Sequence, residues 1–522
     1  MTGKKTRLGW LAVLACALLP ATSRPAAAAD GDTRLADAAM RRDMSAVRAL
    51  LGQNVDVNAP GTDGTPALHW AVRVDDIETT RALLGAGARA SLENRYGVTP
   101  LAIAAGHGSA SMIGVLLDAG ADANALDPAG EPPVMSAVRS GRLDAVQVLL
   151  DRGATVDLTD RAYTQTALMV AVRDNHPEIA QILIDRGAAV NAQTRSGRAP
   201  QFVLPNSVPG FGHGIGIVRG GLPERGLRQA IPGSMTPLLY AARDGRLEAA
   251  SLLLDAGADI NLADGNGITP LIHAIANNHA DVARLLVDRD ADIRARDWYG
   301  RTPLWAAVEV RNMDLDSSTF ENSIDREPLL ALIRTLLDRG ADPNVRTAEV
   351  PPFRREFMHA TGSLSWVDFT GQTPFLTAAL AGDVTVMKLL LDKGADPHIP
   401  TFGGTTALMA AAGVNWVVDQ TFTEGPEALL EAFTLCVALG MDVNAVNSMG
   451  LTAMHGAANR GSDDIIRLLV TLGAALDVED AEGRTPLTWA EGVFLATHPA
   501  RPKPSSIALI KQLSSEKTAA TP

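Results

Sequence analysis

The sequence predicts an all-α solenoid of about twelve helix-turn-helix repeats joined by extended turns. One pattern recurs along most of the 522 residues, usually at intervals of 33. Every copy has an alanine four residues after its first helix begins, and eleven copies end the second helix at a residue that tolerates positive φ. So short a unit cannot bury its own apolar side chains, and neighbouring copies must cover one another. The predicted first helices begin at Arg34, Ala67, Pro100, Pro133, Ala167, Pro237, Pro270, Pro303, Pro374, Ala407, Ala453 and Pro486.

The stretch from Asn94 to Leu126 shows how one copy forms a pair of helices. Thr99 can cap the first helix with its hydroxyl, and Pro100 suits the first helical position, where no amide hydrogen is needed. Gly108 breaks that helix, and a second apolar stripe with helical spacing follows. Gly120 then takes the left-handed conformation that ends a helix. The stretch therefore predicts a short helix, a corner and a second helix.

Two positions of the repeat explain how the copies stack. The small side chain four residues into each first helix predicts close contact between the helices of adjacent copies. The position that ends the second helix is usually glycine, and its substitutes, Asn54 and Asp290, are residue types that tolerate positive φ. The alanines are Ala38, Ala71, Ala104, Ala137, Ala171, Ala241, Ala274, Ala307, Ala378, Ala411, Ala457 and Ala490.

These residues give the repeat its resemblance to a known family. Residues 302–304 read Thr-Pro-Leu, and residues 257–261 read Gly-Ala-Asp-Ile-Asn. The pattern resembles the ankyrin repeat, with its T-P-L-H-x-A helix start and its G-A-D-x-N exit, from about residue 33 to residue 513. The motif histidine survives as His69 and His455, and we expect both to be structural. The resemblance implies an all-α ankyrin-repeat solenoid with a concave face and short, projecting β-hairpin fingers.

The first 29 residues predict a secretory signal peptide. Residues 1–7 carry three cations, residues 8–19 are apolar, and three alanines precede Asp30. With the repeats, this segment indicates a bacterial exported ankyrin-repeat protein, either periplasmic or secreted. An uncleaved anchor is one alternative. Another is a lipoprotein, because residues 13–16 resemble a lipobox that ends in Cys16.

Composition limits the kind of partner. The net charge is −13, and cleavage after residue 29 would make it more negative, because it would remove four positive charges and no negative ones. An acidic chain repels nucleic acid and anionic lipid, so we expect neither as a partner. No apolar run after the N-terminus is long enough to predict a membrane span.

Cys436 occupies a position where other copies have leucine, so we expect a buried, unreactive thiol. We expect a monomer.

Four inserts interrupt the repeats. Those at 194–233 and 346–367 lengthen fingers, whereas those at 312–326 and 414–425 lengthen helix corners. The glycines of the first insert do not predict a phosphate loop, because no strand precedes them and no Lys-Ser/Thr follows. The predicted organisation is 1–29 signal peptide, 30–193 repeats one to five, 194–233 Gly/Pro-rich insert, 234–345 repeats six to eight, 346–367 insert, 368–513 repeats nine to twelve, and 514–522 tail.

The sequence contains no catalytic motif of the common kinds. There is no G-x-S-x-G, no H-E-x-x-H, no P-loop and no pair of cysteines. Most carboxylates recur at repeat positions that close a second helix, which favours a solvated structural role. We therefore expect a protein that is not an enzyme and uses no cofactor or metal.

Aromatic residues at the fingertips are the candidate partner-binding residues, because exposed aromatics on a rigid scaffold are typical of interface anchors. The alternative is that they pack beneath the neighbouring inserts as a satellite core. The fingertip candidates are Tyr96, Trp298, Tyr299, Phe369 and Phe402. The candidates in the inserts are His213, Phe353, Phe357, His359 and Trp366.

The sequence favours a non-catalytic scaffold of the bacterial cell envelope that binds a protein on its concave face and fingertips, centred on repeats eight to ten. One alternative is a small-molecule or metal site built from the inserts, with the repeats as a frame. Another is a secreted effector that binds host proteins.

Overall fold

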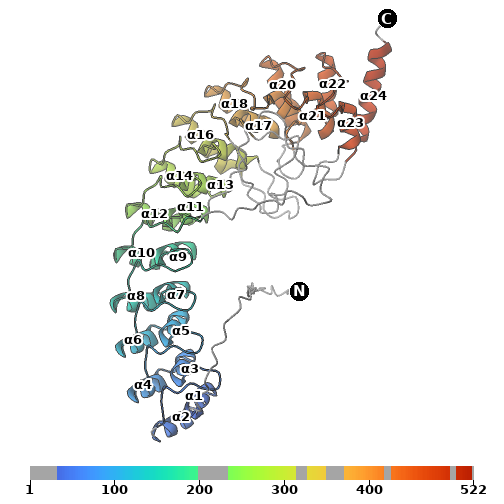
Figure 1. Cartoon of the computed structure of the whole chain (residues 1–522). Helices are drawn as coiled ribbons and strands as arrows, with labels where there is room; N and C mark the ends of the chain where they lie inside the picture. The colour runs from blue at the N-terminus through green and yellow to red at the C-terminus, as the bar shows by residue number, and fades with distance from the viewer. Residues whose placement is uncertain are drawn as a thin grey trace, which may run out of the picture.

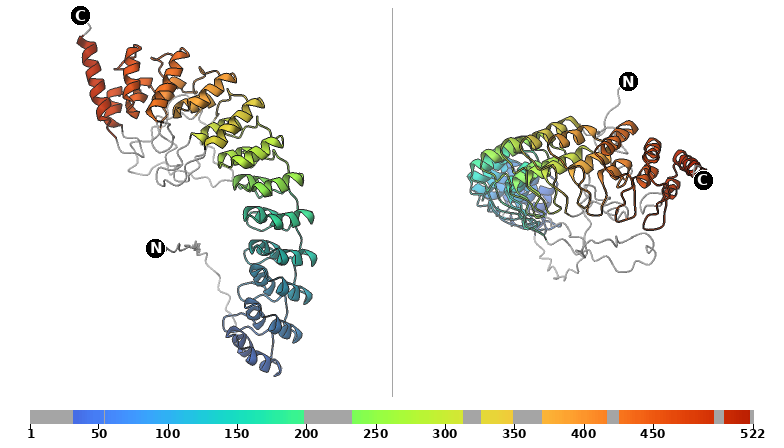
Figure 2. Two further views of the ribbon diagram at one scale, coloured as in Figure 1. Left: turned by 180° about the vertical axis from the view of Figure 1, so that it is seen from behind. Right: turned by 90° about the horizontal axis from the view of Figure 1, so that it is seen from above.

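The protein is a curved stack of helix pairs. The computed structural model describes residues 32–53, 55–197, 233–312, 326–348, 370–416, 425–493 and 501–519. Within these ranges 24 α-helices form twelve pairs, which confirms the predicted all-α solenoid. Odd-numbered helices lie on the inside of the curve and even-numbered helices on the outside (Figure 1). The view from above shows the same two layers (Figure 2).

The inner helices begin at the predicted residues. In α5 the side-chain hydroxyl of Thr99 accepts a hydrogen bond from the Ala102 amide at 3.2 Å, and Pro100 is the first helical residue. Threonine caps recur at most of the other copies because each offers an oxygen to an otherwise unpaired amide. The inner helices are α1 (Arg34–Met40), α3 (Ala67–Arg73), α5 (Pro100–His107), α7 (Pro133–Arg139), α9 (Ala167–Arg173), α11 (Pro237–Arg243), α13 (Pro270–Ala276), α15 (Pro303–Arg311), α17 (Pro374–Ala381), α19 (Ala407–Ala412), α21 (Ala453–Arg460) and α23 (Pro486–Gly492).

The outer helices end as the repeat predicts. Gly120 follows α6 with φ +86, and Asp290 takes the same left-handed conformation after α14 with φ +62. Asn54, the other expected substitute, lies outside the described residues. The outer helices are α2 (Met44–Leu51), α4 (Ile77–Gly85), α6 (Ala110–Asp118), α8 (Leu143–Asp151), α10 (Pro177–Asp185), α12 (Leu247–Asp255), α14 (Ala280–Asp288), α16 (Arg326–Asp338), α18 (Val384–Asp392), α20 (Pro426–Ala438), α22 (Asp463–Thr471) and α24 (Pro504–Ala519).

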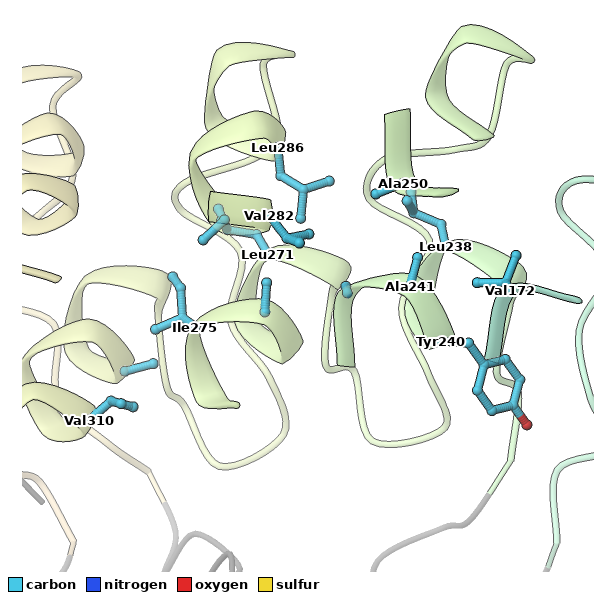
Figure 3. Packing of buried hydrophobic residues seen from close by; sticks show 14 of the residues in the cluster. Val172, Leu238, Tyr240, Ala241, Ala250, Leu271, Ile275, Val282, Leu286 and Val310 are labelled. Atoms are coloured by element: carbon cyan, nitrogen blue, oxygen red, sulfur yellow. The ribbon is translucent and has the colours of Figure 1, made fainter. Parts of the chain in front are cut away.

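One apolar core runs the length of the stack, from Leu35 to Ile510. The twelve alanines at the shared position are all at most 1% exposed, so adjacent inner helices approach closely there, as predicted. In Figure 3, Ala241 lies between the side chains of neighbouring pairs. Cys436 is buried on α20, as expected, and burial raises the pKa of its thiol to about 12.

The fingers are tight turns and not paired strands. Among the described residues the one β pairing is an isolated bridge between Pro60 and Pro66. In a regular finger the Asp264 carboxylate accepts hydrogen bonds from the amides of Asn266 at 2.8 Å and Ile268 at 2.9 Å. The Trp298 amide in turn donates to the Asn266 carbonyl at 3.0 Å. One backbone hydrogen bond therefore joins these two fingers, too few to make a strand.

A second ladder joins successive pairs at the exits of the outer helices. The Asn124 side chain donates to the Gly153 carbonyl at 3.1 Å and accepts from the Thr155 amide at 2.8 Å. A side-chain amide offers both a donor and an acceptor, so one residue can satisfy two backbone groups of the next copy. The same pair of bonds is made by Asn58, Asn191, Asn344 and Asn444.

The predicted finger inserts leave and rejoin the array through closed necks. In an ordinary finger the Asn94 amide donates to the Val98 carbonyl at 3.0 Å. At the first insert the Thr194 amide donates to the Met235 carbonyl at 3.0 Å, and at the second the Thr347 amide donates to Gln372 at 3.1 Å. Both inserts thus start and end at one finger base. Their interiors (198–232 and 349–369), the predicted signal peptide at 1–29, residues 313–325 and 417–424 of the corner inserts, and residues 520–522 of the tail lie outside the described residues.

Candidate protein-binding surface

Two of the predicted fingertip aromatics are exposed on supported turns. Tyr96 is 63% exposed and Phe402 is 58% exposed. The Phe402 ring centroid lies 4.2 Å from the guanidinium carbon of Arg346, which itself donates to the Pro400 carbonyl at 2.6 Å. The two aromatics precede α5 and α19, so they lie seven repeats apart and do not form one patch.

The expectation that Tyr299 is exposed is wrong. Its side chain is only 4% exposed. Arg301 forms a buried ion pair with Asp297 at 2.6 Å, and the same guanidinium lies 5.4 Å from the Tyr299 ring centroid. Trp298 is half-buried, with its ring centroid 6.1 Å from that of Tyr299. The burial of Tyr299 agrees with the alternative interpretation, although the neighbouring insert at 349–369 lies outside the described residues.

The other predicted candidates cannot be placed. Phe369 and the insert residues His213, Phe353, Phe357, His359 and Trp366 all lie outside the described residues. Their roles remain predictions.

Sequence reasoning missed Tyr163, which is 65% exposed at the tip of the finger before α9. The usual fingertip glycine is replaced there by Thr164, which adopts φ +56. Without that glycine the finger was harder to recognise. The available sequence signal was a tyrosine three residues after Asp160. In the structure the Asp160 carboxylate accepts a hydrogen bond from the Tyr163 amide at 2.8 Å.

Sequence reasoning also missed a row of arginines on the inner layer. The inner helices α3, α7, α9 and α11 each end in an arginine: Arg73, Arg139, Arg173 and Arg243. Arg73 lies 5.5 Å from the ring centroid of Trp70, and Arg243 lies 4.9 Å from that of Tyr240. These cation–π contacts hold each guanidinium against a flat apolar surface.

Three arginines of the row form ion pairs with carboxylates, and one of them, Arg243, contacts Asp244 at 2.7 Å. Arg139 reaches back along α7 to Glu131 at 3.1 Å, and Arg173 contacts Asp174 at 3.0 Å. The side chains of Arg139, Arg173 and Arg243 keep 38%, 27% and 38% of their surface exposed. The row is therefore partly neutralised but accessible.

His69 and His455 have the structural role that we expected. The Nε2 atom of His69 lies 2.9 Å from the Val98 carbonyl, and that of His455 lies 3.2 Å from the Arg484 carbonyl. Each contact joins one repeat to the next. Burial lowers the pKa of both rings below its ordinary value, which favours the neutral form at pH 7.

A buried ionic cluster closes the corner insert of repeat eight. The fully buried Asp383 carboxylate accepts from Arg311 at 2.8 Å and from Arg326 at 3.2 Å. Arg326 also donates to the Arg311 carbonyl at 3.1 Å, so the two ends of the insert meet. The cluster ties this corner to the start of α18 and has a structural role.

The described ranges offer neither a candidate metal site nor a candidate membrane span. They contain no group of three or more His, Cys, Asp or Glu side chains that could hold a metal ion. No helix there is both long and apolar enough to cross a membrane.

The fold and this surface together define a helical-repeat protein with a rigid inner layer and exposed fingertips. The sequence profile for ankyrin repeats in three copies matches residues 35–127, 68–161, 112–194, 238–316 and 426–492, and the profile for a single ankyrin repeat matches residues 370–399. These matches cover more than half of the sequence. The chain belongs to the ankyrin repeat family, whose members are in general non-catalytic scaffolds that bind proteins.

Comparisons with individual proteins agree with this membership. The chain is 33% identical over 142 residues to the probable 26S proteasome regulatory subunit p28 of Saccharomyces cerevisiae, covering 27% of this chain and 57% of that protein. It is 34% identical over 120 residues to the B-cell lymphoma 3 protein homolog of Mus musculus, covering 23% of this chain and 25% of that protein. The chain thus spans between a quarter and just over half of the length of these relatives.

Two solved structures are similar over about half of the chain. The ankyrin repeat domain of Bcl-3 matches 47% of this chain and 94% of that one, with 25% identity and a TM-score of 0.37. The ankyrin repeat domain of human ASB11 matches 50% of this chain and 98% of that one, with 25% identity and a TM-score of 0.38.

Proposed function

We propose that the protein is a non-catalytic scaffold that binds a protein partner through its inner face and its fingertips. The observation that carries the proposal is the exposure of three large aromatic side chains on rigid fingers: Tyr96, Tyr163 and Phe402. Tyrosine and other aromatics are enriched among the residues that contribute most to interface affinity. Each of these turns is held by backbone hydrogen bonds to its neighbour, so little conformational entropy is lost on binding.

The position of these residues differs from our expectation for the centre of the surface. The sequence favoured repeats eight to ten, but of its candidates there Tyr299 is buried and Phe369 lies outside the described residues. Tyr96 and Tyr163 belong to the first half of the stack. We therefore propose a partner that contacts several separate fingers and not one local pocket.

Replacement of Tyr96, Tyr163 and Phe402 together by alanine tests the proposal. We expect loss of the native partner in affinity capture from the source organism, followed by mass spectrometry, with unchanged helix content by circular dichroism. The matched control replaces Leu247 and Leu472, which are exposed apolar residues at the outer layer, by alanine. Equal capture by the fingertip variant and the wild type would show that the fingertips do not bind the partner.

We further propose that the protein is exported, to the periplasm or beyond, because residues 1–29 have the composition of a signal peptide. Mass spectrometry of the N-terminal peptide from a cell-envelope fraction should find a chain that begins at Asp30. A lipid-modified Cys16 would establish the lipoprotein alternative, and an intact N-terminus in the cytosol would exclude export. A partner from a host proteome would favour the secreted-effector alternative.

A further inference from the structure

The inner helices α17 and α19 are buried on every side. All eight residues of α17 and all six residues of α19 are buried, and no other described inner helix is buried throughout. An inner helix has an outer helix behind it and an inner helix on each flank, which leaves open the side that faces the inside of the curve (Figures 1 and 2). A helix that is apolar all round needs a covering on that remaining side as well.

This open side carries an apolar cluster of its own. In α17, Phe375 belongs to the main core, whereas Leu376 and Leu380 lie one turn apart on a different side of the helix. These two leucines form a separate buried cluster with Ala410 of α19, and the half-buried Trp416 packs against it. We call these four residues the inner apolar cluster.

Repeat nine differs from the preceding repeats at the position of Leu380. In repeats two to eight no large apolar side chain stands there, and the residue at that position is never buried; the equivalents are Arg73, Gly106, Arg139, Arg173, Arg243, Ala276 and Glu309. Leu380 is only 9% exposed. A position that meets solvent in seven repeats is therefore covered in this one.

Two buried N–H groups beside the cluster lack an acceptor. They are Nε1 of Trp416 and Nε of Arg460, neither of which has a hydrogen-bond partner in the described part of the chain. The Arg460 guanidinium lies 5.3 Å from the Trp416 ring centroid and donates to the Leu380 carbonyl at 2.9 Å, so both groups adjoin the cluster. A buried donor without an acceptor is costly, so the covering should supply acceptors as well as apolar side chains.

We infer that the insert at residues 349–369 packs along the inner face of repeats nine and ten and covers the inner apolar cluster. The insert begins and ends at the finger base directly before α17, where the Gly371 amide donates to the Thr347 carbonyl at 2.8 Å. Half of its length in extended form reaches roughly 30 Å from this neck. The eight residues of α17 extend for only about 12 Å, so the insert is long enough to reach the cluster.

The composition of the insert suits this contact. Residues 349–369 include four aromatics, Phe353, Phe357, Trp366 and Phe369, in a chain that is only 4% aromatic. The first insert is longer, at 198–232, yet it contains only two aromatics. Aromatic side chains would bury the leucines, and the backbone carbonyls of the insert would accept from the two N–H groups.

The inference does not rest on the proposed function, because it concerns a contact within the chain. It assigns part of the inner face to the chain itself, so a protein partner would contact other parts of the array.

Thiol labelling of Leu380→Cys tests the inference in a full-length protein that also carries Cys16→Ser. The variant is made with the intact insert, with residues 349–369 deleted, and with Phe353, Phe357 and Trp366 all replaced by serine. The deletion leaves Thr347, Ala348, Thr370, Gly371 and Gln372, which is the length of the regular finger at 94–98. The native thiol of Cys436 is buried, so its labelling reports unfolding in every sample.

Two matched controls accompany this series. Gly106→Cys places a thiol at the equivalent position of repeat three, where a Cβ atom meets nothing within 4 Å. Deletion of residues 196–232 removes the first insert and leaves a finger of the regular length between Thr194 and Met235.

With the insert intact, we expect Leu380→Cys to react at least about tenfold more slowly than Gly106→Cys, because a covered thiol reacts only after local opening. Deletion of 349–369 and the triple serine variant should each raise the rate at Leu380→Cys at least about tenfold while Cys436 stays unlabelled. Deletion of 196–232 should leave the rate unchanged. Slow labelling with and without the insert would show that the helices and Trp416 cover the cluster alone. Fast labelling in both would show a face open to a partner or to a second copy, and either result would overturn the inference.

A cross-linking measurement on the intact chain decides the matter if a variant unfolds and Cys436 becomes labelled. Phe353→Cys, Phe357→Cys and Trp366→Cys are each paired with Trp416→Cys and treated with a short bifunctional thiol reagent. We expect at least one pair to cross-link, and we expect none of the three to cross-link to Gly106→Cys. Failure of all three pairs with Trp416→Cys would exclude the insert from the cluster.

Discussion

The close approach of α19 and α21 leads to a sharp prediction about one methyl group. A Cβ atom on Gly456 would lie 2.6 Å from the Val414 amide nitrogen and 2.9 Å from the Gly413 carbonyl carbon. Both contacts are to backbone, which cannot move aside as the end of a long side chain can. The short α19 ends at Ala412, and Gly413 with φ +124 turns the chain against α21.

The Gly456→Ala variant therefore sets two effects against each other. Alanine is favoured over glycine in a helix interior by about 1 kcal/mol. Overpacking of a tight contact costs about 1–3 kcal/mol, and the distance of 2.6 Å lies at the severe end. We expect a net loss of about 1–2 kcal/mol in the free energy of unfolding.

Gly114→Ala is the matched control. Gly114 lies within α6, and a Cβ there would meet only the Val148 side chain at 3.9 Å, an ordinary contact. We expect that variant to gain up to about 1 kcal/mol, because only the helix preference acts.

Urea unfolding followed by circular dichroism measures both changes. Because a solenoid can unfold in parts, hydrogen exchange of the α19–α23 amides locates the loss. A Gly456→Ala protein as stable as the wild type, or more stable, would refute the reasoning. So would a loss in both variants, since it would show that the contact distance does not decide the outcome.

Three further predictions concern buried polar groups. Arg460→Met should lower the free energy of unfolding by about 1–3 kcal/mol in urea titrations, because it removes hydrogen bonds to two carbonyls, one in α17 and one in α19; an unchanged midpoint would contradict this. Burial lowers the pKa of His69 and His455, so the unfolded chain binds more protons than the folded chain as the pH falls below about 6.5. The contribution of the two neutral histidines to the free energy of unfolding should be fully present above that pH and be lost below it. Replacing both histidines by glutamine should flatten a plot of unfolding free energy between pH 7 and 5. Cys436, with its pKa raised to about 12, should react with a disulfide reagent only as the protein unfolds, and rapid labelling of the native protein would count against its burial.

The repeat pattern predicted most of the fold because backbone chemistry repeats with it. Threonine before proline caps a helix wherever it recurs, so Pro303 and Pro374 begin their helices as expected. The alanine position was equally predictable, since only a small side chain lets inner helices touch. The expectation of β-hairpin fingers was wrong for the described residues, because periodicity does not show whether a turn is closed by paired strands or by one Asp side chain such as Asp264.

The candidate site was predicted less well, because exposure depends on contacts from elsewhere. Tyr96 and Tyr299 occupy equivalent fingertip positions, yet one is exposed and the other is covered beside the Asp297–Arg301 ion pair. The arginine row was present in the aligned repeats. It was missed because the arginine occurs in only some copies, whereas the fold was predicted from positions that are nearly the same in every copy.

The closed necks at Thr194 and Thr347 have a consequence for how such an array can change. Each neck uses the same amide-to-carbonyl bond as an uninterrupted finger, so the register of the helices does not depend on what lies beyond it. A stretch of any length whose two ends meet at hydrogen-bonding distance can be grafted there without disturbing the neighbouring pairs. The inserts can therefore change without a change in the helical array. A single insertion at a finger base could give the protein a new binding specificity.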